Sequence, residues 1–323
     1  MPTDLHGANI LVTGGAGFVG SHIVDQALAA GAARIAVIDD FVRGRRENLA
    51  SAMATERLNV IEGDICDEGL IDELTEGVDI VFHQAALRIT QCAEEPVRAV
   101  RVMINGTQNV LEAALRHKVQ RVIAASSASV YGEPSYLPID EAHPFNNRTL
   151  YGAAKIANEQ ILRSYAEMFG MQYVMLRYFN IYGPRMDIYG VYTEVLARWM
   201  DRIDAGQAPV IFGDGTQSMD LVYVGDVARS NILAAQSDVT DEVFNVGTGV
   251  ETTLRQLCEM LLVEMGRPDL EPVHEPERKV NPVRRRTASV DRAKAAIGFE
   301  AAASVRDGLR ELIAWRKESL CLS

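Results

Sequence analysis

A tyrosine and a lysine four residues apart have the clearest capacity for proton transfer in this sequence. Tyr151 and Lys155 lie in the segment 151–169, whose pattern predicts a helix, and this spacing puts both side chains on one face of it. A free tyrosine titrates near pH 10, so a tyrosine base near neutral pH needs its pKa lowered by about three units. A neighbouring ammonium favours the phenolate. The same spacing also occurs by chance in exposed helix pairs, so its meaning depends on its surroundings.

A glycine-rich stretch, TGGAGFVG, predicts where a nucleotide binds. Gly14, Gly17 and Gly20 follow an apolar run and precede a segment with helical spacing. Such a tight turn needs positive φ at some positions, and a pyrophosphate must approach a backbone that carries no Cβ. The following helix offers unpaired N–H groups and its positive end to the phosphates. This strand–turn–helix context is the one that a dinucleotide fingerprint requires. The expected contacts are Gly14, Gly17, Phe18, Val19 and Gly20.

An acidic residue at the end of the next apolar run favours NAD over NADP. Asp39 stands nineteen residues after Gly20. An acid at about this distance accepts hydrogen bonds from both ribose hydroxyls and repels a 2′-phosphate. Arg43, Arg45 and Arg46 lie just downstream and leave NADP open, although such a cluster is also typical of a solvated basic loop.

The first half of the chain alternates predicted strands with predicted helices, which implies a parallel sheet covered on both faces. The strands are expected at 9–12, 34–38, 58–62, 79–83, 121–125 and 172–176. The helices are expected at 21–30, 70–76, 96–117 and 151–169. We therefore predict an α/β fold, a Rossmann-type doubly wound parallel sheet, with ligands at the carboxyl ends of its strands.

Further candidate ligands follow three of these strands. Asp64 could bond the adenine amino group of a cofactor or cap the next helix, and both readings stay open. Arg88 could meet a phosphate or form a surface ion pair with Glu94 or Glu95. The fifth strand leads into a serine cluster, SSASVYG, that contains no carboxylate. The expected cofactor contacts after the third and fourth strands are Asp64, Ile65, Gln84, Ala85, Ala86 and Arg88.

Composition narrows the class of protein. A net charge of −12 over 323 residues argues against non-specific nucleic-acid binding. No apolar run approaches eighteen residues, and no basic-then-apolar leader is present, so we expect neither a membrane span nor a signal peptide. The four cysteines are scattered without a C-x-x-C pair, which suits a reducing cytoplasm and gives no reason to expect a metal site.

The motifs together resemble the extended short-chain dehydrogenase/reductase family. TGGAGFVG, HQAA, SSASVYG, YGAAK and RYFNIYGPR occur in the family's order, and the resemblance covers nearly the whole chain. It is closest to the NAD-dependent nucleotide-sugar epimerases and dehydratases, in particular to the UDP-galactose 4-epimerase type. It implies Tyr151 as catalytic base, Lys155 as its partner and as a ligand of the nicotinamide ribose, and Ser127 as the hydroxyl partner on the sugar. It also implies Tyr178 as a cofactor contact.

The resemblance divides the chain into two lobes and implies substrate contacts. Residues 1–180 are expected to form the NAD-binding domain, with some return segments from about 220–247, and residues 181–323 the nucleotide-sugar-binding lobe. Similar proteins usually carry an arginine where Met219 stands, and that arginine grips the sugar nucleotide's diphosphate. Arg185, Arg278 or the run 284–286 could replace it, the alternative for that run being a solvated loop. The expected substrate contacts are Ser129, Asn180, Arg185, Thr193 and Arg278.

The serine cluster separates the reactions known in this family. Similar 4,6-dehydratases carry Asp-Glu at the positions of Ala128 and Ser129, and UDP-glucuronate decarboxylases usually carry Glu at the latter, whereas this chain has neither carboxylate. The resemblance therefore implies 4-epimerisation, in which C4 of the sugar is oxidised, the 4-keto sugar turns, and hydride returns to the opposite face. Open alternatives are a 4-keto-sugar reductase, a dehydratase or decarboxylase with displaced carboxylates, and a non-catalytic NAD-sensing protein.

Assembly and packing are expected from resemblance and pattern. The helices at 96–117 and 151–169 would pair across a homodimer, although their apolar residues could equally face the sheet. Trp199 and Trp315 are expected in the core of the second lobe. The nature of the sugar cannot be read from the sequence, and UDP is favoured only because the resembled enzymes use it.

Overall fold

The central element is a seven-stranded sheet whose hydrogen-bonded neighbours are all parallel. The computed structural model describes residues 4–188, 195–276 and 283–321. The strand order is β10-β6-β5-β4-β1-β2-β3. The strands are β1 (Asn9–Thr13), β2 (Arg34–Asp39), β3 (Leu58–Glu62), β4 (Ile80–His83), β5 (Arg121–Ser127), β6 (Tyr173–Tyr178) and β10 (Glu242–Val246). The chain progresses in one direction from β1 to β3 and in the other from β4 onward, so a topological switch point lies between β1 and β4, where ligands of such sheets bind.

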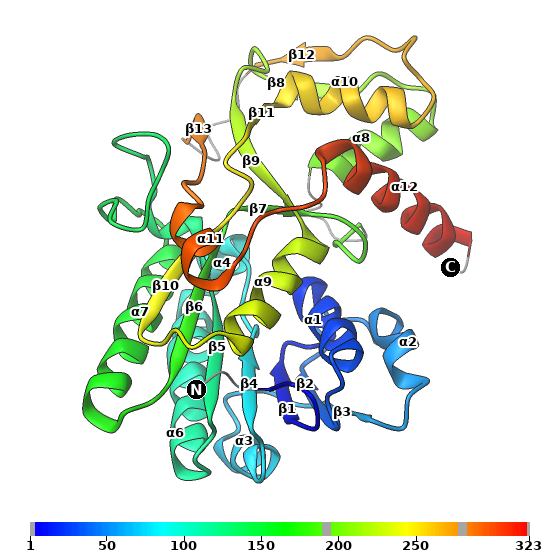
Figure 1. Ribbon diagram of the computed structural model, residues 1–323. Helices are drawn as coiled ribbons and strands as arrows, with labels where there is room; N and C mark the ends of the chain where they lie inside the picture. Colours follow the sequence, from blue (N-terminus) through cyan, green and yellow to red (C-terminus); the bar gives the residue numbers. More distant parts are fainter. Residues whose placement is uncertain (1–3, 189–194, 277–282, 322–323) are drawn as a thin grey trace.

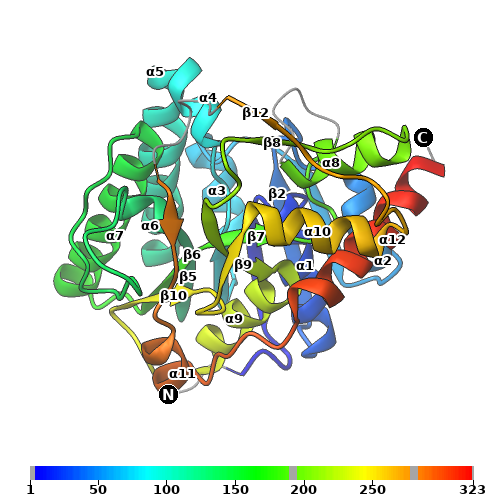
Figure 2. The same ribbon diagram turned by 90° about the horizontal axis from the view of Figure 1, so that it is seen from above.

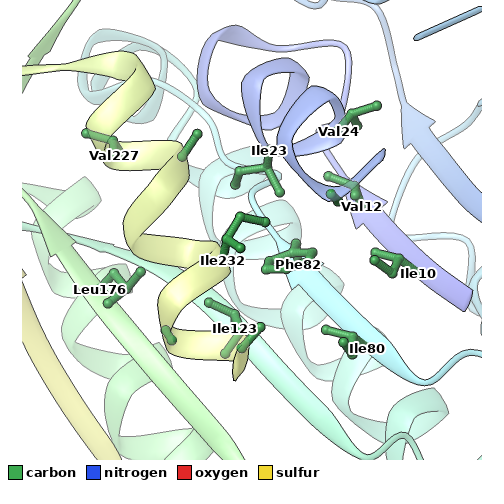
Figure 3. Close-up of a cluster of buried hydrophobic side chains, with 14 of the residues drawn as sticks. Ile10, Val12, Ile23, Val24, Ile80, Phe82, Ile123, Leu176, Val227 and Ile232 are labelled. Atoms are coloured by element: carbon green, nitrogen blue, oxygen red, sulfur yellow. The ribbon is translucent and has the colours of Figure 1, made fainter. Parts of the chain in front are cut away.

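Helices cover both faces of this sheet and bury two apolar cores (Figure 1). On one face, α1 (Phe18–Ala29) and α9 (Val224–Gln236) pack side by side on the strands. Figure 3 shows Ile23 of α1 and Ile232 of α9 directed toward Phe82 of β4. On the other face lie α3 (Glu68–Thr75), α6 (Thr107–Arg116) and α7 (Leu150–Phe169). A parallel sheet needs this double cover, because both of its faces are apolar.

A second lobe lies over the carboxyl ends of the strands (Figures 1 and 2). Its strands are β7 (Asn180–Tyr182), β8 (Val210–Phe212), β9 (Ser218–Tyr223), β11 (Glu251–Thr253), β12 (Val273–Glu275) and β13 (Arg285–Arg286). Its helices are α8 (Val195–Asp204), α10 (Leu254–Glu264) and α12 (Val305–Cys321). Strand β9 is central, with β7, β11 and β13 as its partners. Trp199, which is 1% exposed, lies in this lobe's apolar core as the sequence predicts.

Short elements connect these layers. They are η1 (Arg46–Leu49), α2 (Ala50–Met53), α4 (Ile89–Glu94), α5 (Pro96–Val100), η2 (Arg101–Gly106), η3 (Ala128–Val130) and α11 (Asp291–Ile297). None of the helices in the described part of the chain is long and apolar enough to cross a membrane.

The predicted α/β fold with its parallel sheet is confirmed, but several helices differ from expectation, and two of them show why. The predicted helix at 96–117 is divided into α5, a π-helical segment η2 and α6. An extra residue in one turn leaves no trace in a 3.6-residue pattern, so periodicity alone cannot reveal it. Helix α9 was not predicted, because buried polar residues such as Asn231 and Ser230 interrupt its apolar pattern.

Candidate functional site

A cleft at the carboxyl ends of β1, β2 and β4 brings together fourteen of the fifteen predicted cofactor contacts. These are Gly14, Gly17, Phe18, Val19, Gly20, Asp39, Asp64, Ile65, Gln84, Ala85, Ala86, Tyr151, Lys155 and Tyr178. Arg88 is the predicted contact that is not part of the cleft wall. Residues that lie more than a hundred positions apart in the chain meet here, because a parallel sheet collects its strand ends at one edge.

The glycine loop has the geometry of a phosphate cradle. Gly14 has φ of +66°, and a Cβ there would lie 2.8 Å from the amide nitrogen of Ala85. A Cβ on Gly20 would lie 2.2 Å from the carbonyl oxygen of Gly14. Gly17 caps α1 without a side-chain hydrogen bond, so no capping side chain competes for the N–H groups of the first turn. This loop therefore fits a pyrophosphate at the helix N-terminus.

Asp39 lies at the end of β2 in the cleft wall and is 7% exposed. Its carboxylate accepts hydrogen bonds from the amides of Ala16 and Phe41, both at 3.0 Å. Burial raises its pKa, and these hydrogen bonds oppose the shift. Two of the downstream arginines form ion pairs, Arg43 with Asp187 at 3.2 Å and Arg46 with Glu62 at 3.1 Å.

The structure bears on the alternatives that the sequence left open for Asp64 and Arg88. Asp64 accepts a hydrogen bond from the amide of Cys66 at 2.9 Å, while the cap of α3 is Asp67, so the capping alternative for Asp64 is wrong. Arg88 lies 3.7 Å from Asp187, an acid that the sequence pattern did not single out. An acidic partner so distant in sequence cannot be read from local spacing.

Tyr151, Lys155 and Ser127 converge where β5 meets α7. Thr149 caps α7 through a 3.1 Å hydrogen bond from the amide of Gly152, so Tyr151 lies in the first turn. The Lys155 ammonium donates to the carbonyl oxygen of Ala125 at 2.7 Å and lies 5.8 Å from the centre of the Tyr151 ring. The Ser127 hydroxyl lies close enough to Tyr151 to lower the pKa of its phenol, and it donates a hydrogen bond to the Ser129 hydroxyl at 3.2 Å.

Burial dominates the electrostatics of this group. It raises the pKa of Tyr151 to about 12, and the nearby Ser127 hydroxyl opposes this shift. It lowers the pKa of Lys155 to about 8, against the nearby Cys92 and Glu159. At pH 7 the phenol is therefore protonated and the ammonium is mostly charged. The phenol becomes a base only when additional positive charge lowers its pKa, and an oxidised nicotinamide ring carries such a charge.

A buried ion pair behind the site joins α7 to the sheet. Arg177 of β6 and Glu159 of α7 are 4% and 3% exposed and form two hydrogen bonds, at 2.7 and 2.9 Å. Glu159 also accepts a hydrogen bond from the hydroxyl of Ser126, the neighbour of Ser127. Arg177 donates to the Tyr131 hydroxyl at 2.8 Å. The helix that carries Tyr151 is thereby tied to the strand end that carries Ser127.

The predicted substrate contacts are more dispersed. Ser129 lies beside Ser127, and Asn180 begins β7, in register with Leu221 of β9. Arg185 borders the cleft with φ of +68°, and its guanidinium is paired with Asp25 of α1 at 2.7 Å. Thr193 and Arg278 lie outside the described residues.

The cleft also includes residues that sequence reasoning missed. They are Val42, Gly44, Asn48, Leu87, Gln91, Val102, Met186 and Trp315, among others. Trp315 was expected in the core, yet it both packs on the core of the second lobe and forms part of the cleft wall. Helical spacing identifies an apolar face but cannot tell which of its residues borders a cavity, so no signal in the sequence could have revealed this.

Comparisons with known proteins agree with this geometry. The model of the NAD dependent epimerase/dehydratase family matches residues 10–247. A putative UDP-glucose 4-epimerase of Methanocaldococcus jannaschii is 34% identical over 96% of this chain and 99% of its own length. A dTDP-glucose 4,6-dehydratase of an Actinoplanes species is also 34% identical, over 95% of this chain and 97% of its own.

A solved structure extends the likeness to three dimensions. The UDP-N-acetylglucosamine 4-epimerase of Methanobrevibacter ruminantium has a TM-score of 0.91, 33% identity, and coverage of 97% of this chain and 99% of its own. These similarities confirm the resemblance drawn from the motifs and the expectation of NAD as cofactor.

The glycine loop leads to a test of the cofactor site. Gly20→Ala puts a methyl group against the backbone of Gly14, so we expect the purified variant to carry at least tenfold less NAD than the unaltered protein, as measured by the nucleotide released on denaturation. Gly69→Ala is the matched control, because a Cβ there meets only the Asp67 carboxylate at 3.6 Å, an ordinary contact. Equal NAD content in both variants would contradict the assignment of the loop.

Proposed function

Because the chain belongs to the NAD dependent epimerase/dehydratase family, we propose that it is a nucleotide-sugar 4-epimerase, with a UDP-sugar as substrate. One observation carries the choice of reaction. The turn at the end of β5, which brings Ser129 against the first turn of α7, carries no carboxylate from Ser126 to Tyr131. Elimination of water needs an additional acid and base near the sugar, whereas epimerisation needs one proton carrier. Elimination of water is the alternative reaction, because one of the similar proteins is a dTDP-glucose 4,6-dehydratase.

The roles of the residues follow from their contacts. Tyr151 takes the proton of the sugar C4 hydroxyl, and Ser127, whose hydroxyl lies near Tyr151, orients that sugar hydroxyl. The Lys155 ammonium stabilises the phenolate and reaches the ribose next to the nicotinamide. Bound NAD supplies hydride transfer to and from C4. After the 4-keto sugar has turned and C4 presents its opposite face for the return of hydride, Tyr151 returns the proton to the C4 oxygen.

We also propose that Arg286 binds the diphosphate of the substrate in place of the arginine that Met219 replaces. In the parallel pair of β13 and β9, Arg286 is in register with Met219. Its Nε is buried and has no hydrogen-bond partner among the described residues, and burial lowers its pKa. A buried guanidinium nitrogen without a partner is costly, and a phosphate oxygen would relieve that cost.

We further propose that the chain consists of an NAD-binding lobe and a nucleotide-sugar-binding lobe, and that it forms a homodimer. Helix α5, which forms the first part of the expected interface helix 96–117, carries exposed apolar side chains, with Val97 at 83% and Val100 at 45% exposure. Val110 and Leu111 of α6 instead belong to the core on the sheet. For α6, the alternative that its apolar residues face the sheet therefore applies. We propose a dimer through α5 and its neighbours, and a cytoplasmic location.

The reaction can be tested by product analysis. Purified protein is incubated without added cofactor with UDP-glucose, UDP-N-acetylglucosamine and UDP-glucuronate in turn, and products are examined by mass spectrometry and proton NMR. We expect an unchanged mass and the small H3–H4 coupling of an axial C4 hydroxyl with one of them. Loss of water or carbon dioxide would instead assign the dehydratase or decarboxylase reaction.

The same assay tests the catalytic base. Tyr151→Phe removes the hydroxyl that carries the proton, so turnover should fall by about 100-fold or more, the lower range of general acid–base contributions, while NAD stays bound. Tyr136→Phe removes the hydroxyl of an exposed tyrosine and should leave turnover unchanged. Normal turnover in the Tyr151 variant would contradict the assignment of Tyr151 as the catalytic base.

Arg286→Met tests the diphosphate contact. A buried charged hydrogen bond contributes about 1.5–3 kcal/mol, so KM should rise by about 10- to 150-fold with a smaller change in kcat. Arg285→Met is the control, because that side chain is 61% exposed and pairs with Glu251. An unchanged KM in the Arg286 variant would move the diphosphate site elsewhere.

A further inference from the structure

The C-terminal helix reaches the cofactor cleft through a single large side chain. Arg316 of α12 is 5% exposed, and its guanidinium pairs with Asp201 at 2.6 Å and with Asp204, both of α8. Leu309 and Leu312 of α12 are fully buried in the core of the second lobe. Trp315 lies three residues after Leu312, which puts it at the edge of the same apolar face of α12. It packs against the core of the second lobe and also forms part of the cleft wall.

Trp315 meets the same apolar surface as the cofactor-binding loop. Phe18 is the first residue of α1, directly after the glycine turn, and it packs against the core of the second lobe, as Trp315 does. Met186, from the segment after β7, is 3% exposed and belongs to both that core and the cleft wall. The second lobe therefore contributes an apolar wall beside the helix N-terminus where a pyrophosphate binds.

We propose that Trp315 is a cofactor-site residue, and that the second lobe retains bound NAD by packing this indole against it. An indole buries a large, rigid surface at little cost in conformational entropy, which suits a contact whose purpose is slow release. The departure of NAD would break this contact. The indole cannot easily move aside with α12, because the Arg316 ion pairs hold α12 to α8. The proposal concerns cofactor binding and does not depend on which sugar is the substrate.

Retention has a chemical consequence. An enzyme that removes hydride from a sugar and returns it to the same molecule must keep its cofactor through both steps. A net oxidoreductase must exchange it in every cycle. A cofactor that is held by a side chain of the second lobe suits the first type of reaction.

The release rate of NAD tests the proposal. Purified protein with bound NAD is mixed with alcohol dehydrogenase and excess ethanol, so that each released NAD is reduced and its absorbance at 340 nm reports the rate. We expect release from Trp315→Ala to be at least tenfold faster than from the unaltered protein, with Trp315→Phe in between. Lys317→Ala, an exposed position of the same helix, should release NAD at the unaltered rate.

A second control separates contact from stability. Leu312→Ala opens the core of the second lobe on the same helix, and Leu312 is not part of the cleft wall. We expect this variant to melt at a lower temperature and to retain NAD like the unaltered protein. If Leu312→Ala and Trp315→Ala release NAD equally fast, or if Trp315→Ala releases it at the unaltered rate, the proposed contact is wrong.

Fluorescence gives a readout that needs no destabilising change in the cleft. The chain has two tryptophans, and the indole of Trp199 is buried and donates to the carbonyl oxygen of Val210 at 2.7 Å. In Trp199→Phe the remaining emission comes from Trp315, and we expect it to be quenched when NAD is added to cofactor-depleted protein. In Trp315→Phe the emission of Trp199 should change much less. Equal quenching of the two tryptophans would also overturn the proposal.

Discussion

The buried ion pair between Glu159 and Arg177 is the interaction on which the arrangement of the site depends. Two hydrogen bonds join the two side chains, and both are almost inaccessible to water. A buried pair adds little net stability compared with an apolar pair, but the loss of one partner leaves an isolated charge in the interior at a cost of about 3–5 kcal/mol. The pair therefore works mainly as a constraint, because any displacement of α7 relative to β6 separates it.

That constraint extends to the reacting groups. Glu159 lies one helical turn after Lys155 and two after Tyr151, and it accepts a hydrogen bond from Ser126. Arg177 continues the network to Tyr131, whose hydroxyl donates to Asn245 of β10 at 2.6 Å. Helix α7, the end of β5 and the loop that follows β5 are thus held in fixed positions relative to one another. Contacts between segments far apart in the chain therefore help to place Tyr151 relative to Ser127.

The second lobe is attached by another buried carboxylate. Asp220 of β9 is fully buried and accepts hydrogen bonds from the amides of Thr248, Gly249 and Ala288, at 2.7, 2.9 and 3.1 Å. Several backbone donors stabilise the charged form of a buried carboxylate, although burial alone raises its pKa. Ala288 follows Arg286 by two residues, so the same contacts hold β13 beside Met219. Strand β9 is therefore joined to the segments that follow β10 and β13 by polar contacts that only the folded chain can make.

The fold class and fourteen of the residues that line the cofactor cleft could be predicted from the sequence alone. The signals for this are local, because a glycine turn such as that of Gly14 has few structural alternatives. The ends of parallel strands meet at one edge of the sheet, so residues such as Asp39 and Ala85 can be predicted to lie close together. Only the tertiary structure decided that Asp25 pairs with Arg185, that Arg286 stands beside Met219, and that Trp315 faces the cleft. Each of these contacts joins segments far apart in the chain. Their partners are chosen by packing and by the cost of burying an unpaired charge, and neither leaves a periodic mark in the sequence.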